Sequence, residues 1–199
     1  MKKIVLATTN THKFNEIKDI LSSVLDEVEF LPLKGGYGAP PPREDGKTFL
    51  ENALIKSRYY YSKLKIPVLS DDSGLEVESL GGKPGVLSAR YAGENSTQRD
   101  LINKLLKEME GITNRKARFV CIAVFMYGSE KFIFSEGILY GRISYEPRGN
   151  RGFGYDPVFI PDNYDKTLAE LGEEIKNKIS HRYNAFFNLA LKIKELGII

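Results

Sequence analysis

The chain has one cysteine and two histidines among its 199 residues. A single cysteine excludes a disulfide within the chain, and Cys121, His12 and His181 are too few and too scattered for a zinc site. Cys121 lies in an apolar run, which is typical of a small core residue rather than a nucleophile. Because nothing in the sequence requires an oxidising environment, we expect the protein in the cytoplasm.

Long hydrophobic runs are also missing. The first apolar run ends at Ala7, which is too short for a signal peptide, and no later run could cross a membrane. Hydrophobic residues make up 42% of the chain and charged residues 28%, so the chain can form a sizeable core. The net charge of +3 is too small to indicate a surface for duplex nucleic acid, but it suits an anionic partner such as a nucleotide.

Short apolar runs alternate with amphipathic segments along the sequence. We expect strands over residues 3–8, 28–33, 66–70, 119–127, 131–134 and 158–160. We expect helices to begin near Asn10, at the capping boxes Thr48-x-x-Glu51 and Thr97-x-x-Asp100, and after Ser180. This order predicts an α/β fold with a mixed β-sheet flanked by helices. It also predicts one domain over residues 1–199, because no linker or repeat interrupts it.

Two long loops, over residues 34–47 and 146–156, interrupt this pattern, and long loops inside compact domains are often functional. Glu44 in the first loop is a carboxylate that either faces solvent or binds a ligand. Glu51 is explained by its capping box, so we do not expect it to bind a ligand.

Two adjacent carboxylates follow the apolar run that begins at Val68. Asp71 and Asp72 are costly to bury unless they hold a cation or transfer a proton, although a turn at the end of the strand would also explain them. Successive side chains of a strand point to opposite faces, so only one of the two is expected to face a site. Carboxylates with little histidine or cysteine nearby favour Mg²⁺, and magnesium in turn indicates a phosphate substrate.

The segment Thr8-Thr9-Asn10-Thr11-His12-Lys13 lies between the first expected strand and the first expected helix. Free N–H groups at a helix start bind anions, and the side chains of this segment add hydrogen bonds and the charge of Lys13. The segment therefore fits a phosphate site, but a polar loop that caps a helix fits it nearly as well.

The second long loop and the residue after it include the segment Gly149-Asn150-Arg151-Gly152-Phe153-Gly154-Tyr155-Asp156-Pro157. Its glycines permit close approach to a ligand, its aromatic rings can stack on a flat base, and Asp156 can accept a hydrogen bond from a base edge. The alternative is a mobile loop whose Phe153 and Tyr155 rings pack into the core.

Three further cations lie near the start of the last expected helix, at Lys176, His181 and Arg182. Cations usually favour the other end of a helix, so an unpaired His181–Arg182 pair indicates an anion or a base to be bound. A solvated helix face is the alternative for Lys176.

Six short segments are spread over nearly the whole length of the chain. They are Ala7-Thr8-Thr9-Asn10-x-x-Lys13, Thr48-Phe49-Leu50-Glu51-Asn52-Ala53, Asp71-Asp72-Ser73-Gly74-Leu75, Gly81-Gly82-x-Pro84-Gly85-x-x-Ser88-Ala89-Arg90-Tyr91, Gly152-Phe153-Gly154-Tyr155-Asp156-Pro157 and Ser180-His181-Arg182. In this order they resemble the inosine triphosphate pyrophosphatase family, which removes non-standard purine nucleoside triphosphates. The resemblance implies an elongated mixed α/β fold in two lobes with a central cleft, and a homodimer.

The resemblance also implies an activity and a set of site residues. The activity is Mg²⁺-dependent hydrolysis of ITP, dITP and XTP to the monophosphate and pyrophosphate. Glu44 and Asp72 would hold the magnesium, and Asp72 would be the proton acceptor. Substrate phosphates would be bound by Thr8, Thr9, Asn10, Thr11, His12 and Lys13, with Ser73 also at the substrate. The base would be bound by Phe153, Gly154, Tyr155, Asp156, Lys176, His181 and Arg182.

Two other functions are open to these residues. A phosphatase with Asp71 or Asp72 as metal ligand or nucleophile would release orthophosphate instead of pyrophosphate. A nucleotide- or RNA-binding module would bind without turnover and with a steep salt dependence, and the modest net charge counts against it.

Overall fold

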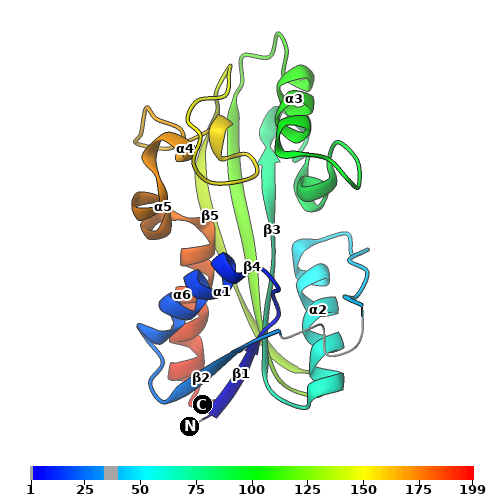
Figure 1. The fold of residues 1–199 in the computed structure, drawn as a ribbon, viewed down its shortest axis with the longest axis vertical. Coiled ribbons are helices and arrows are strands. Elements are labelled where there is room, and N and C mark those ends of the chain that lie inside the picture. The colour runs from blue at the N-terminus through cyan, green and yellow to red at the C-terminus, as the bar shows by residue number, and fades with distance from the viewer. Residues whose placement is uncertain (1, 34–39) are drawn as a thin grey trace. The chain divides into compact units, whose positions relative to one another are not determined.

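A six-stranded sheet organises the fold in the computed structural model, which describes residues 2–33 and 40–199. The strands lie in the order β2-β1-β3-β4-β5-β6 (Figure 1). Their bounds are β1 (Lys2–Leu6), β2 (Val28–Pro32), β3 (Val68–Val77), β4 (Lys116–Gly128), β5 (Lys131–Ile143) and β6 (Phe159–Pro161). β1 runs parallel to β2 and β3, whereas β5 and β6 are antiparallel, so the predicted mixed sheet is confirmed.

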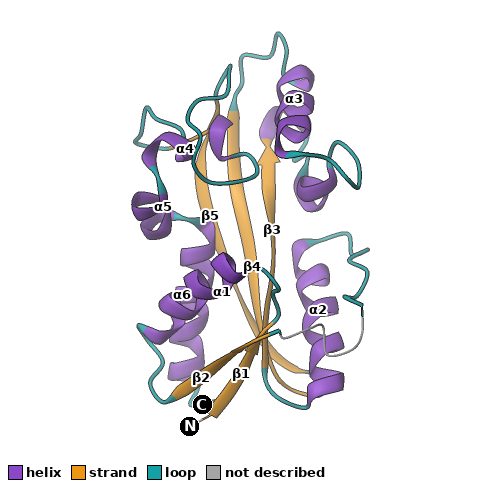
Figure 2. Cartoon of the chain, viewed as in Figure 1, coloured by secondary structure: helices purple, strands orange, loops and turns teal. Residues whose placement is uncertain are grey.

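Most of the helices begin where the sequence predicts a helix start, and Figure 2 shows the helices in purple. Their bounds are α1 (Thr11–Ser22), α2 (Phe49–Leu64), α3 (Gln98–Glu108), α4 (Leu168–Leu171), α5 (Glu173–Ile179) and α6 (His181–Glu195). Asn10 caps α1, and the two predicted capping boxes are complete at the starts of α2 and α3. The sequence reasoning missed α4 and α5, although Thr167 and Glu170 form a third capping box at the start of α4.

The third strand is longer than the sequence predicts. It does not end at Ser70 but continues through both carboxylates to Val77. The reason is that Leu75 and Val77 keep an alternating apolar pattern and are buried in a core beyond the carboxylates. Asp71 and Asp72 therefore lie within a strand and not at its carboxyl end, which corrects the prediction.

The chain divides into two compact units, each built from several segments. Unit 1 comprises Met1–Asp72, Cys121–Gly137 and Arg182–Ile199, and unit 2 comprises Ser73–Val120 and Ile138–His181. The strands β3, β4 and β5 contribute residues to both units. One domain over residues 1–199 stays a prediction. Of the first long loop, residues 34–39 lie outside the described part of the chain.

The core of unit 1 lies on both faces of its strands. Ile4 and Leu6 of β1 pack in one core with α1, α6 and Cys121, and Val5 between them packs in another with Tyr60 of α2. Figure 1 shows α2 on the opposite side of β1 from α1 and α6. The fully buried Cys121 is a core residue, as its apolar run predicts.

The core of unit 2 joins α3 to the strands. Leu101 and Leu105 of α3 pack with Leu75 and Val77 of β3 and with Phe159. Within the described ranges, no helix has the length and apolar character needed to span a membrane.

Candidate active site

The start of α1 lies at the edge of the sheet where β1 ends. The N–H of Ala7 donates to the carbonyl of Leu69 over 2.7 Å, which places the loop after β1 beside β3. Asn10 Oδ1 accepts a hydrogen bond from the N–H of Lys13 over 3.1 Å, and Thr8 Oγ1 accepts from the N–H of Asn10 over 3.2 Å. No acidic residue occupies the first turn of α1, so the helix itself supplies no countercharge to its positive end.

The remaining side chains of this segment, Thr9, Thr11 and His12, are exposed. The segment is therefore a capped helix start, as both sequence interpretations require. It also presents polar side chains and N–H groups toward solvent, where an anion can bind.

Asp71 is a buried carboxylate paired with two cations. Lys13 Nζ lies 2.7 Å from Asp71 Oδ1, and Arg182 Nε lies 4.0 Å from Asp71 Oδ2. Burial alone would raise the pKa of Asp71, but Lys13 and Arg182 outweigh it and hold the pKa at about 2. Arg182 also donates to Glu16 Oε2 over 2.9 Å. The description of His181–Arg182 as an unpaired cationic pair is therefore wrong, because β3 and α1 supply counterions for Arg182.

Asp72 faces a different helix. Asn52 Nδ2 donates to Asp72 Oδ2 over 3.0 Å, and Lys56 Nζ lies 3.8 Å from Asp72 Oδ1. Burial raises the pKa of Asp72 above its ordinary value, against the opposing effects of Lys56 and the hydrogen bond from Asn52. A raised pKa suits a carboxylate that accepts a proton near neutral pH.

Lys56 links Asp72 to the loop that carries Glu44. Its Nζ donates to Glu44 Oε2 over 2.8 Å. Burial alone would lower the pKa of Lys56, but Asp71, Asp72 and Glu44 outweigh it and raise the pKa, so the ammonium group stays charged. Sequence reasoning missed Lys56. The available signal was its position one helical turn after Asn52, which places both side chains on one face of α2.

The donor set around Lys56 fits a magnesium ion. Glu44 and Asp72 both lie within 4 Å of one ammonium group, so their oxygens can reach a common cation. Across residues 2–33 and 40–199, no three histidine, cysteine, aspartate or glutamate side chains cluster as metal ligands. Mg²⁺ typically takes one or two protein carboxylates and completes its shell with water and substrate phosphates.

In unit 2, Asp156 and Lys176 form a buried ion pair. Lys176 Nζ donates to Asp156 Oδ2 over 2.5 Å, and the N–H of Phe153 donates to the same oxygen over 2.8 Å. The Lys176 ammonium lies 4.0 Å from the centre of the Phe153 ring, and 57% of the surface of Phe153 is exposed. Lys176 is therefore not on a solvated helix face.

The turn before this ion pair requires glycine. Gly152 has φ +76°, and a Cβ atom there would lie 2.2 Å from Asp156 Oδ2. Glycine therefore lets the backbone of the loop approach the carboxylate closely.

The other predicted residues of unit 2 are partly or fully buried. Tyr155 packs in the core and donates from its hydroxyl to the carbonyl of Ser88 over 2.9 Å, so its ring is not presented for stacking. The His181 ring stacks on Phe119 with centres 4.8 Å apart and an angle of 12° between the ring planes. Ser73 is half-buried in β3.

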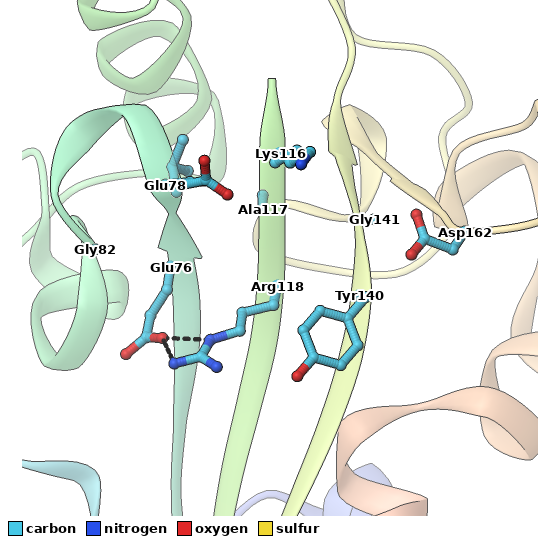
Figure 3. Close-up of a pocket in the computed structure, with 10 residues that line it drawn as sticks. Glu76, Glu78, Gly82, Lys116, Ala117, Arg118, Tyr140, Gly141 and Asp162 are labelled. Atoms are coloured by element: carbon cyan, nitrogen blue, oxygen red, sulfur yellow. Dashed lines mark hydrogen bonds and ion pairs between the residues drawn. The ribbon is translucent and has the colours of Figure 1, made fainter. Parts of the chain in front are cut away.

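A separate pocket of about 620 Å³ lies over β3, β4 and β5 in unit 2 (Figure 3). Arg118 donates to Glu76 there through both Nε and a terminal nitrogen, each over 2.7 Å. Its other charged or aromatic lining residues are Glu78, Lys116, Tyr140 and Asp162. None of the predicted site residues lines this pocket, so it is not the candidate active site.

Comparison with known proteins gives consistent matches over almost the whole chain. A family model described as the Ham1 family matches residues 4–192. The chain is 48% identical to a dITP/XTP pyrophosphatase of Aquifex aeolicus, with 96% of each chain covered, and 43% identical to one of Clostridium tetani, with 98% and 97% covered. It is 39% identical to the solved HAM1 protein of Coxiella burnetii, with a TM-score of 0.91 over 98% of this chain and all of that one.

Proposed function

The chain belongs to the Ham1 family, and on this premise we propose that it hydrolyses ITP, dITP and XTP to the nucleoside monophosphate and pyrophosphate. One observation carries the proposal. Asp72, whose pKa burial raises, lies beside Lys56, and the same ammonium group binds a second carboxylate, Glu44. That arrangement suits a cation-assisted attack of water on a phosphoric anhydride.

Magnesium is the proposed cofactor, held by Glu44 and Asp72. When bound, it neutralises phosphate charge and makes phosphorus a better electrophile. Asp72 accepts the proton of the attacking water, and its raised pKa brings it closer to the value that an efficient general base needs.

The start of α1 is the proposed phosphate site. Thr8, Thr9, Asn10, Thr11, His12 and Lys13 bind the phosphates through N–H groups, side-chain hydrogen bonds and the Lys13 charge. Fixed donors of this kind stabilise the negative charge that develops on the phosphate oxygens. Asp71 fixes the ammonium of Lys13, and Arg182 is the second cation beside Asp71.

The proposed base site lies in unit 2. It is formed by Phe153, Gly154, Tyr155, Asp156, Lys176 and His181. Ser73 of the same unit also contacts the substrate, and Arg182, next in the chain after His181, is likewise proposed to bind the base. Phe153 offers an exposed ring for stacking, whereas Tyr155 contributes by holding the loop to Ser88. Lys176 and His181 can donate a hydrogen bond to the 6-oxo group of a hypoxanthine or xanthine base. The Lys176 ammonium cannot accept a hydrogen bond from the amino group of adenine, which is itself a donor, and a site built on such bonds rejects the wrong group strongly.

We also propose that the enzyme works as a homodimer in the cytoplasm. The family resemblance supports the dimer, and a single, buried cysteine suits a reducing compartment. Sedimentation equilibrium of the purified protein tests the dimer, which predicts twice the monomer mass of 22.5 kDa.

Product analysis tests the proposed reaction. XTP is incubated with the purified protein and MgCl₂, and the products are separated by ion-exchange chromatography. The proposal expects xanthosine monophosphate and pyrophosphate in equal amounts. Xanthosine diphosphate with orthophosphate would instead support a phosphatase, and binding without turnover would support a nucleotide-binding module.

A further inference from the structure

Asn52 is a buried amide that connects the two carboxylate-bearing segments of unit 1. Only 1% of its surface is exposed. Its Nδ2 donates to Asp72 Oδ2 over 3.0 Å, while its Oδ1 accepts from the N–H of Gly46 over 2.8 Å. Gly46 lies two residues after Glu44. One side chain therefore spans the distance between β3 and the loop that carries the second carboxylate.

The loop is held close to α2 at this point. A Cβ atom on Gly46 would lie 2.7 Å from Asn52 Oδ1 and 2.7 Å from Glu51 Cβ, so only glycine allows the observed approach. Glu51 Oε2 accepts from the N–H groups of Lys47 and Thr48 over 2.6 and 3.1 Å. The backbone that follows Glu44 is thus fixed by two consecutive side chains of α2.

The hydrogen bond from Asn52 to Asp72 also determines which oxygen of the Asp72 carboxylate is available to bind a cation. Asn52 occupies Oδ2, and Lys56 is the cation that faces Oδ1. Because an amide carries no charge, Asn52 can orient Asp72 without competing with a bound cation. Outer hydrogen bonds of this kind fix the ligating carboxylates of metal sites.

We propose that Asn52 is a positioning residue that sets the spacing and orientation of Glu44 and Asp72 for a divalent cation. The proposal rests on the proposed function, because it concerns the same two carboxylates. It adds that the metal affinity of this site depends on a residue that does not itself bind the metal.

The test is the affinity of the free protein for Mn²⁺, measured by electron paramagnetic resonance without nucleotide. Asn52→Ala is expected to weaken Mn²⁺ binding by about 10- to 100-fold, the usual effect of losing an outer hydrogen bond to a metal ligand. The matched control is Ser57→Ala, because Ser57 is also buried in α2 and its hydroxyl donates to the carbonyl of Leu54 in the same helix. Unchanged Mn²⁺ affinity in Asn52→Ala, or an equal loss in Ser57→Ala, overturns the proposal.

A second variant keeps Asn52 and disturbs its partner. Gly46→Ala places a methyl group against Asn52 Oδ1 and is expected to weaken Mn²⁺ binding in the same direction, even if Asn52→Ala does not fold. Wild-type affinity in Gly46→Ala would contradict the proposal, as would a wild-type protein that binds no Mn²⁺. The Mn²⁺ measurement contains no nucleotide, so it does not depend on turnover. A wild-type protein that binds Mn²⁺ here but releases no pyrophosphate from XTP in the product assay would contradict the proposed function and leave this proposal standing.

Discussion

The carboxylates of Asp71 and Asp72 are adjacent in β3 but are held by different helices. Asp71 pairs with Lys13 of α1 over 2.7 Å, whereas Asp72 accepts a hydrogen bond from Asn52 of α2 over 3.0 Å. The pKa of Asp71 is held at about 2, and that of Asp72 is raised. One carboxylate therefore serves as a permanent counterion, and its neighbour is placed to exchange a proton.

Asp72→Asn should abolish most of the turnover while leaving the fold intact. Loss of a general base usually costs about 10²- to 10⁴-fold in rate, and loss of a metal ligand adds to that. Pyrophosphate release from ITP measures the effect, and circular dichroism checks the fold. Asp45→Asn, an exposed carboxylate near Glu44, is the control and should keep wild-type turnover. Hydrolysis by Asp72→Asn near the wild-type rate would remove Asp72 from the proposed mechanism.

Asp71→Asn should change how stability depends on pH. Because the folded-state pKa of Asp71 lies below its unfolded value, its ionisation stabilises the fold above about pH 4. That stabilisation, on the order of 2 kcal/mol, is lost as the pH falls from about 4 toward 2. The free energy of urea unfolding should therefore differ most between wild type and variant above pH 4, and the difference should shrink in acid. A difference that stays constant from pH 6 to pH 2 would contradict the ion pair with Lys13.

Lys56→Met should move the acidic limb of the kcat/KM profile to higher pH. Lys56 lowers the pKa of Asp72, so its removal raises that pKa and leaves less of the ionised base at a given acidic pH. Lys63→Met removes a lysine from the same helix, where its ammonium lies 4.8 Å from the centre of the Tyr59 ring, and should leave the profile unchanged. A profile for Lys56→Met that overlays the wild type would argue against electrostatic coupling between Lys56 and Asp72.

Lys176→Met should destabilise unit 2 and weaken substrate binding. Removing one partner of a buried ion pair typically costs about 3–5 kcal/mol because the other charge is left without compensation. The double variant Lys176→Met/Asp156→Asn should recover much of the unfolding free energy but not the KM for ITP. If the double variant also recovered the wild-type KM, the ion pair would be structural only.

Local sequence signals predicted the helix starts well. The capping boxes at Thr48 and Thr97 depend on side chains and N–H groups only three residues apart. They can therefore be recognised from the local sequence without knowing how the rest of the chain folds. The parity of a strand likewise predicted that Asp71 and Asp72 would have separate roles, and their separate partners are consistent with this.

Contacts between distant segments could not be predicted in this way. The sequence pointed to Asp156 and Lys176 as separate candidates, but their pairing over 20 positions depends on how unit 2 folds. In the sequence, Lys56 cannot be distinguished from an ordinary lysine on a helix surface. Its role becomes visible only from the fold, which places Glu44 and Asp72 beside its ammonium group. The length of β3 was also underestimated, because two adjacent carboxylates favour the end of a strand. Cations from distant segments compensate their charge and allow both to lie within the strand.

The central claim is selective release of pyrophosphate from non-standard purine nucleotides, and a substrate screen tests it most directly. The values of kcat/KM are measured with MgCl₂ for ITP, dITP, XTP, ATP and GTP, with pyrophosphate as the detected product. The account predicts that ITP, dITP and XTP exceed ATP by at least about 100-fold, because donors placed for a 6-oxo group leave the 6-amino group of adenine without an acceptor. Equal rates for all five nucleotides, or no pyrophosphate from any of them, would contradict it.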